Sequence, residues 1–166
     1  VIGYGCTSAS LLIGDEKITK IVQSKVRTDN VTTPMLAVKK ALKTLGTNKI
    51  GYIAPYVSEI AHKMCSHLGQ AGFEVVKAAT FAEDRDSVVG VITPKSIFKA
   101  IETLIDRSDH LDAIFISCTS LKCASIISLA EEKFGLPLLS SNSVLAWDMM
   151  KLSKATVSKK GKGKLF

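Results

Sequence analysis

Short apolar segments alternate with longer amphipathic segments along most of this 166-residue sequence. The apolar segments have the length of β-strands and occur at residues 1–5, 49–54, 73–79 and 112–117. Each is followed by a stretch in which apolar residues recur with helical spacing. This alternation predicts βαβ units, in which parallel strands form a sheet that helices cover on both faces. We therefore expect an α/β protein.

Two helix starts are marked by the same dipeptide. Thr33-Pro34 and Thr93-Pro94 each place an N-cap hydroxyl before a proline at the first helical position. Further helices are expected at 8–23, with an interruption at Gly14, and at 141–151. These boundaries place the loops that follow each strand, where the chemistry of such folds is usually found.

Positive charge is confined to one end of the chain. The formal net charge is +7, but residues 1–150 hold 16 basic and 15 acidic residues, whereas residues 151–166 hold six lysines and no acid. We expect this end to be a solvated tail. A neutral body, in a chain with only ten aromatic residues, does not favour a nucleic-acid surface. No apolar run reaches the ~18–20 residues of a membrane span, so neither a nucleic acid nor a membrane is an expected partner.

The cysteine pattern matches neither a disulfide framework nor a metal site. The four cysteines lie at 6, 65, 118 and 123. This irregular spacing favours reduced thiols in the cytoplasm. Cys65 and Cys123 align with apolar helical positions, so we expect both to lie in the core as small hydrophobes.

Two nearly identical tetrapeptides stand out: Gly5-Cys6-Thr7-Ser8 and Ser117-Cys118-Thr119-Ser120, whose cysteines lie 112 residues apart. Each follows an apolar strand and precedes a helical segment. A helix N-terminus favours the thiolate form of a nearby cysteine, and its N–H groups with neighbouring hydroxyls hold anions. We expect the two turns to face each other, with Cys6 and Cys118 on either side of one small acid.

Six segments together are typical of one protein family: GYGCTSAS at 3–10, VTTPMLAVKKALKTLG at 31–46, IGYIAPY at 50–56, ISCTSLK at 116–122, SSNSVLAWDMMKL at 140–152 and the closing GKGKLF. Through these segments the sequence resembles the maleate isomerase and arylmalonate decarboxylase branch of the aspartate/glutamate/hydantoin racemase superfamily. The resemblance covers essentially the whole chain.

The resemblance implies two pseudo-symmetric lobes, with parallel sheets flanked by helices, a site between the lobes, and no metal or organic cofactor. On that basis we expect residues 1–33 to be the remainder of a first lobe and residues 34–140 to form the second lobe. Residues 141–166 would be a helix that returns to the first lobe, followed by the basic tail. Family members carry a further strand and helix before the first cysteine turn. We therefore expect the first lobe to be incomplete and apolar surface to be exposed around residues 1–5.

The resemblance also assigns roles to individual residues. Cys6 and Cys118 match the two catalytic cysteines of the family. Substrate carboxylates would be bound by residues of the two turns and of the loop after the second strand, namely Thr7, Ser8, Tyr56, Thr119 and Ser120. Arylmalonate decarboxylases have glycine in the position of Cys6, which argues against that activity here. The segment 83–87 lacks an asparagine that we would expect in a maleate isomerase.

These observations lead to a cofactor-independent isomerase of a small dicarboxylate such as maleate. Cys6 would add to the double bond, and Cys118 would act as general acid and base. Three alternatives stay open: an amino-acid or hydantoin racemase, an arylmalonate decarboxylase-like enzyme, and an inactive chain that binds small acids. The expected ligand is a small carboxylate, and the expected assembly is a homodimer.

Overall fold

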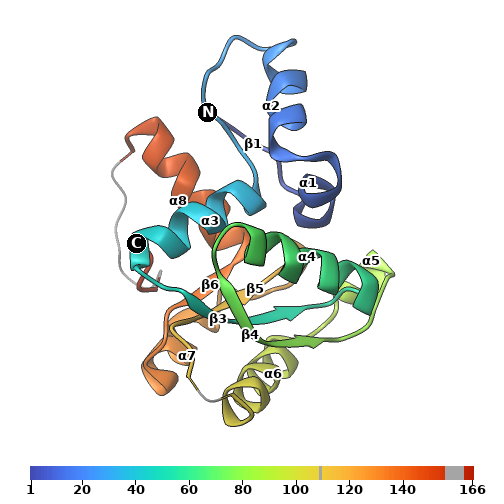
Figure 1. The fold of residues 1–166 in the computed structure, drawn as a ribbon, viewed down its shortest axis with the longest axis vertical. Coiled ribbons are helices and arrows are strands. Elements are labelled where there is room, and N and C mark those ends of the chain that lie inside the picture. Colours follow the sequence, from blue (N-terminus) through green and yellow to red (C-terminus); the bar gives the residue numbers. More distant parts are fainter. Residues whose placement is uncertain (109, 156–162) are drawn as a thin grey trace.

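The computed structural model describes residues 1–108, 110–155 and 163–166. These residues form two sheets of parallel strands, one with two strands and one with four, flanked by helices (Figure 1). The expected fold class, an α/β protein with parallel sheets, is confirmed. The division into lobes at residues 33 and 140 stays a prediction.

The small sheet is built from the first part of the chain. Its elements, in chain order, are β1 (Ile2–Gly3), α1 (Thr7–Ile13), α2 (Asp15–Gln23) and β2 (Val31–Thr32). Gly14 has φ +90°, a conformation that favours glycine, and it separates the expected helix into α1 and α2. Val1 is exposed and the β1 residues are half-buried. The short strand β2 was not predicted.

The large sheet has strand order β4-β3-β5-β6. Its strands are β3 (Lys49–Ala54), β4 (Glu74–Thr80), β5 (Ala113–Ile116) and β6 (Leu138–Ser140). The chain leaves β3 toward one side to form β4 and then crosses to the other side of β3 to form β5. The strand order therefore reverses between β3 and β5, and in open parallel sheets the crevice beyond the carboxyl ends at such a point is where ligands bind.

Helices cover both faces of the large sheet (Figure 1). One face carries α3 (Pro34–Leu45), α4 (Ser58–Gln70) and α8 (Ser141–Ser153), and the other carries α6 (Pro94–Asp106) and α7 (Ile127–Phe134). A single turn, α5 (Asp86–Val89), precedes α6. Successive strand residues point to opposite faces. Accordingly, Tyr52 and Phe115 pack under α3, α4 and α8, whereas Ile53 and Ile116 pack against α6 and α7.

The predicted helix starts are confirmed. The Thr33 side chain accepts a hydrogen bond from the N–H of Leu36 at 3.1 Å, and Thr93 caps α6 in the same way through Ser96. At α8 the cap is reciprocal, because Ser140 and Ser143 each bind the other's backbone N–H. These caps satisfy N–H groups that would otherwise lack a partner.

Helix α8 returns from the large sheet to the small one. Its Asp148 is 3% exposed and accepts hydrogen bonds from the Thr32 hydroxyl at 2.5 Å and from Lys40 Nζ at 2.8 Å. A Cβ on Gly3 would lie 2.5 Å from Met149 Sδ, so glycine allows β1 to approach the helix closely. Asp148 thereby connects α8 to β2 and α3, and this holds the two sheets in one body.

The last residues fold back onto the protein. The backbone N–H of Lys164 donates to the buried Glu131 carboxylate at 2.8 Å, and Lys164 Nζ donates to the carbonyl of Gly135 at 2.6 Å. Leu165 is 8% exposed and belongs to the same core cluster as Trp147. The expectation of a solvated tail is therefore wrong for this segment, because its apolar end is buried. Lys159, Lys160 and Lys162 lie outside the described residues.

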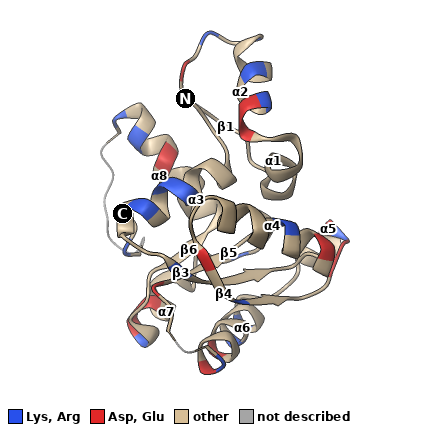
Figure 2. Cartoon of the chain, viewed as in Figure 1, with Lys and Arg blue, Asp and Glu red and all other residues tan. Residues whose placement is uncertain are grey.

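Charged residues of both signs are spread over the molecule, and several helices, α2 among them, carry both (Figure 2). Within the described ranges, every helix is too short or too polar to cross a membrane. Neither observation identifies a binding surface, so the loops beyond β3 and β5 remain the expected position of a functional site.

Candidate functional site

Two of the expected site residues lie beyond the strands between which the order reverses. Tyr56 follows β3 by two residues and Cys118 follows β5 by two residues. Cys118 is 7% exposed. The carbonyl of Tyr56 accepts a hydrogen bond from the Thr80 hydroxyl, which fixes the loop after β3 to the end of β4. Sheet topology alone therefore brings a phenol and a thiol to the same edge.

The first cysteine turn lies at the start of α1. Cys6 is the N-cap residue of this helix and is partly exposed. Its Sγ lies 3.8 Å from the hydroxyl of Ser8, while Thr7 is buried at 1% exposure. The partly exposed thiol of Cys6 therefore lies beside the hydroxyl of Ser8, whereas Thr7 between them is buried.

The two cysteine turns meet, as the sequence predicted. The Thr119 hydroxyl donates to the carbonyl of Gly5 at 3.0 Å, which joins the second turn directly to the first. A second connection runs through Ser141, whose hydroxyl accepts from the Thr7 hydroxyl at 2.8 Å and from the Cys118 N–H at 3.0 Å. The neighbours of each cysteine are therefore hydrogen-bonded to the neighbours of the other.

Ser141 was not among the predicted site residues. It is the first residue of α8 and is completely buried. The adjacent Asn142 also reaches the second turn, because its side-chain amide donates to the carbonyl of Thr119 at 2.9 Å. The one sequence signal was the position of both residues in the segment 140–152, on which the family resemblance partly rested.

One expectation about the second turn is wrong. Cys118 does not open a helix of its own, because residues 119–126 form turns and α7 begins only at Ile127. The start of α8 lies beside Cys118 instead, through Ser141. Cys118 also has φ +102°, which is unfavourable for a residue with a side chain and costs about 1–3 kcal/mol. The bond to Ser141 helps to hold this backbone conformation.

The hydrogen bonds between the turns limit what the threonines can do. A hydroxyl has a single proton to donate. Thr7 donates its proton to Ser141, and Thr119 donates its proton to Gly5. In this arrangement neither hydroxyl has a proton left for a substrate carboxylate, whereas those of Ser8 and Tyr56 are not committed in this way. Ser120 lies half-buried in the second turn. Substrate binding by these residues stays a prediction.

Tyr56 is placed to act as a neutral donor. Its hydroxyl oxygen is buried and lies near Thr7, Ser117 and Cys118. Burial is the main cause that raises the pKa of Tyr56 well above its ordinary value, and the adjacent Cys118 thiol raises it further. The phenol therefore keeps its proton at neutral pH and can donate it to an anion.

The other two cysteines differ from the pair in the turns. Cys123 is 2% exposed, and burial raises the pKa of its thiol to about 12. Its expected place in the core is confirmed. Cys65 is only half-buried against the edge of the core, where desolvation also raises its pKa. No group of three or more potential metal ligands is found among the residues the structure describes.

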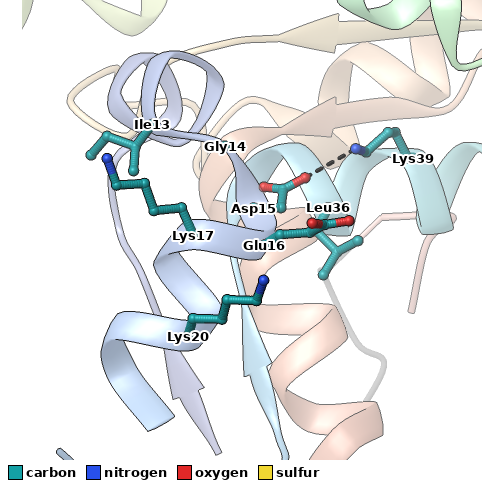
Figure 3. Close-up of a pocket in the computed structure, with 8 residues that line it drawn as sticks. All are labelled: Ile13, Gly14, Asp15, Glu16, Lys17, Lys20, Leu36 and Lys39. Atoms are coloured by element: carbon teal, nitrogen blue, oxygen red, sulfur yellow. Dashed lines mark hydrogen bonds and ion pairs between the residues drawn. The ribbon is translucent and has the colours of Figure 1, made fainter. Parts of the chain in front are cut away.

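A pocket of about 670 Å³ lies elsewhere, where α1 meets α2 and packs against α3 (Figure 3). Asp15 and Lys39 form an ion pair of 3.0 Å at its wall, and Lys17 and Lys20 extend along α2. None of the residues that line it is a cysteine or carries a hydroxyl group. Despite its volume, this pocket lacks the chemistry of the cysteine turns, which remain the candidate site.

Comparison with known proteins agrees with the fold and with the resemblance. The chain is 24% identical over 159 residues to the maleate isomerase of Alcaligenes faecalis, an alignment that covers 91% of this chain and 62% of that protein. This chain thus spans less than two thirds of the length of that relative.

Solved structures of similar fold give the same picture. The maleate isomerase of Pseudomonas putida S16, solved with maleate, superposes with a TM-score of 0.90 at 19% identity, over 99% of this chain and 68% of that one. The maleate cis-trans isomerase of Nocardia farcinica, solved with a covalently bound succinylcysteine intermediate, gives a TM-score of 0.89 at 20% identity. The match covers 99% of this chain and 70% of that one. A model of the arylmalonate decarboxylase family matches residues 2–166. The chain belongs to the arylmalonate decarboxylase family.

Proposed function

We propose that this chain carries the two-cysteine site of a cofactor-independent cis-trans isomerase that acts on a small dicarboxylate such as maleate. The observation that supports this most directly is the junction of the two cysteine turns through Ser141 and through the bond from Thr119 to Gly5. Two thiols on joined turns, with a neutral phenol beside Cys118, suit covalent catalysis on an unsaturated acid.

In the proposed reaction the Cys6 thiolate adds to one alkene carbon of maleate, and a C–S bond forms as the π bond breaks. The electron pair moves toward the adjacent carboxylate, and Cys118 delivers its thiol proton to the neighbouring carbon. Rotation about the resulting single bond follows. Cys118 then removes the proton again, the C–S bond breaks, and fumarate leaves. Atoms and charge balance over the cycle, and both thiols return to their starting states.

Tyr56 would stabilise the negative charge that develops on the carboxylate during addition. Because burial raises its pKa, the phenol stays protonated while the thiolate forms. A positioned donor of this kind in a water-poor site contributes several kcal/mol to transition-state stability. Ser8, beside Cys6, is the second hydroxyl available to a substrate carboxylate.

The unequal environments of the two cysteines favour an isomerase over the alternative, a two-base racemase. A racemase uses two thiols in equivalent roles on opposite faces of one carbon. Here Cys6 is partly exposed at a helix start, whereas Cys118 is buried with a strained backbone. This asymmetry suits one nucleophile and one proton carrier. Cys6 itself argues against the decarboxylase alternative, because the arylmalonate decarboxylases carry glycine there.

The test is to incubate the purified chain with maleate, an arylmalonate and single enantiomers of aspartate and glutamate in deuterated water, and to follow each by proton NMR. The proposal predicts fumarate from maleate and no loss of the α-proton signal of the amino acids. Exchange of that α-proton would instead establish the racemase, and loss of a carboxylate from the arylmalonate would establish the decarboxylase. Turnover of none of these acids would rule out an active isomerase in this chain.

We also propose a homodimer in a reducing cytoplasm as the working form. The four cysteines are all free thiols, which suits such a compartment. Leu12, Ile21 and Val26 expose large apolar side chains on the first part of the chain, where a second copy would bury them. Light scattering after size exclusion gives the assembly directly, and a monomeric mass at micromolar concentration would refute the dimer.

A further inference from the structure

Three hydroxyl groups lie buried at or behind the candidate site, and two of them have no assigned role. They belong to Tyr52, Tyr56 and Ser117, and none makes a hydrogen bond of standard geometry to the residues that the structure describes. Tyr52 and Ser117 are completely buried. Leaving a buried hydroxyl unpaired is costly, because the group has lost its hydrogen bonds to water. Three such groups at or directly behind one site indicate hydrogen bonds that form when a ligand is bound.

The sheet places these hydroxyls in a row. Tyr52 on β3 pairs with Phe115 on β5, and their rings lie 6.0 Å apart between centroids. Ser117 is two residues beyond Phe115, so its side chain lies on the same face of the sheet, one step closer to the crevice. Burial raises the pKa of both phenols, and the nearby Ser117 hydroxyl partly offsets this rise in each. Tyr56 also lies beside Cys118. The order from the core outward is Tyr52, Ser117, Tyr56.

We propose that Tyr52 and Ser117 are positioning residues, which form a one-way chain of hydrogen bonds that directs the Tyr56 proton into the site. Tyr52 donates to Ser117, Ser117 donates to Tyr56, and Tyr56 donates to the carboxylate of the bound acid. Neither Tyr52 nor Ser117 touches the substrate. This inference rests on the proposed function, because it assigns supporting residues to the same site.

The direction of the chain follows from which groups have acceptors. Tyr52 is completely buried, and after burial the hydroxyl of Ser117 has the largest effect on the pKa of its phenol. The proposed chain therefore starts with Tyr52 donating to Ser117, because in the reverse direction Tyr56 would donate inward and away from the substrate. At the open end, Thr7 already donates its own proton to Ser141 and therefore cannot donate to Tyr56. Each bond in such a chain strengthens the next.

The chain can be tested without any substrate, because the protein has three tyrosines. Labelling with tyrosine that carries ¹³C at Cζ gives one NMR signal each for Tyr4, Tyr52 and Tyr56, and this shift responds to hydrogen bonding at the hydroxyl. We expect Tyr52→Phe to move the Tyr56 signal, because the proposed chain connects the two phenols through Ser117. Ser117→Ala should move both the Tyr52 and the Tyr56 signals and leave Tyr4 unchanged.

Thr47→Val is the matched control, because it removes another buried hydroxyl, which donates to the Leu42 carbonyl at the far end of α3. It should leave all three signals in place. An unmoved Tyr56 signal in Tyr52→Phe would overturn the inference. This outcome does not depend on turnover, so it is distinguishable from a failure of the proposed isomerase activity. Tyr52→Phe preserves the shape of the ring, and it decides the question even if Ser117→Ala fails to fold.

Binding of a saturated dicarboxylate gives a second readout. Succinate should bind about 2- to 10-fold more weakly to Tyr52→Phe, the range expected for weakening one hydrogen-bond donor. In a Tyr56→Phe background the same substitution should have no further effect, because Tyr52 acts only through Tyr56. Equal losses in both backgrounds would mean that Tyr52 has a purely structural role.

Discussion

The hydroxyl of Thr7 donates a 2.8 Å hydrogen bond to the hydroxyl of Ser141, a residue 134 positions further along the chain. The same Ser141 oxygen accepts the N–H of Cys118. One buried oxygen therefore sets the spacing between the two cysteine turns. Its position at the first residue of α8 also links that spacing to the helix that spans both sheets.

Ser141→Ala should loosen this junction. The substitution leaves the Thr7 hydroxyl and the Cys118 N–H buried without an acceptor, at about 1–3 kcal/mol for each unpaired donor. Urea unfolding should register that loss, and turnover should fall about 10²-fold, as expected when reacting groups shift by about 1 Å.

The control is Ser153→Ala, at the exposed end of the same helix, where the hydroxyl binds only the Met150 carbonyl. It should change neither quantity appreciably. If Ser141→Ala matched this control in both stability and turnover, the junction would not determine the site.

Substitution of each turn cysteine should distinguish the nucleophile from the proton carrier. Cys6→Ser replaces a thiol by an alcohol that does not ionise at neutral pH, so turnover should fall by at least ~10²–10⁴-fold. Cys118→Ser should lose a similar factor yet trap a covalent adduct on Cys6, visible as a mass increase equal to the bound acid. Cys65→Ser, at a half-buried position outside the site, should retain parental turnover. Parental activity in either turn variant would refute the proposed mechanism.

Cys123 should contribute a recognisable pH dependence to stability. Its folded pKa of about 12 lies above the ~8.5 of an unfolded thiol. The buried thiol's contribution is complete below about pH 8.5, and it is lost between there and pH 12 because the unfolded chain ionises first. The free energy of unfolding of Cys123→Ala should therefore fall less steeply with pH across this window than that of the parent. Identical slopes in urea titrations at pH 8, 9 and 10 would contradict the assignment.

Leu165 should matter to stability as much as a residue in the middle of a strand. Leu165→Ala removes a side chain that is 8% exposed, and such changes cost about 2–5 kcal/mol. Leu129→Ala makes the same chemical change at 56% exposure on α7 and should stay within about 0.5 kcal/mol. Thermal unfolding of the two variants gives the comparison, and equal melting temperatures would mean that the last residues are not part of the core.

Local sequence signals predicted most of the fold. The Thr-Pro caps, Gly14 and the apolar periodicity each act within one helical turn, so they can be recognised without knowledge of the fold. The second cysteine turn was misassigned because residues 119–126 contain helix-compatible residues, and only the tertiary structure shows that α7 starts later. Short strands such as β2 carry too few residues to display a period.

The site was predictable only in part, for a similar reason. Two similar turns after apolar strands pointed to Cys6 and Cys118 as candidates. The strands before them belong to different sheets, so only the tertiary structure shows how the turns are joined. Ser141 and Tyr52 could not be found this way. A serine after a helix cap and a tyrosine within a strand are ordinary residues for those places, and their partners lie far away in sequence.

The burial of Leu165 among the same side chains that cover β3 and β5 also has a consequence for synthesis. While residue 165 is still inside the ribosome, the core on that face of the sheet lacks one of its members. Nascent chains must therefore wait with apolar surface uncovered, a state that is prone to aggregation and calls for chaperones. Any extension attached after residue 166 would also have to leave the protein beside α3 and α8 without displacing this leucine.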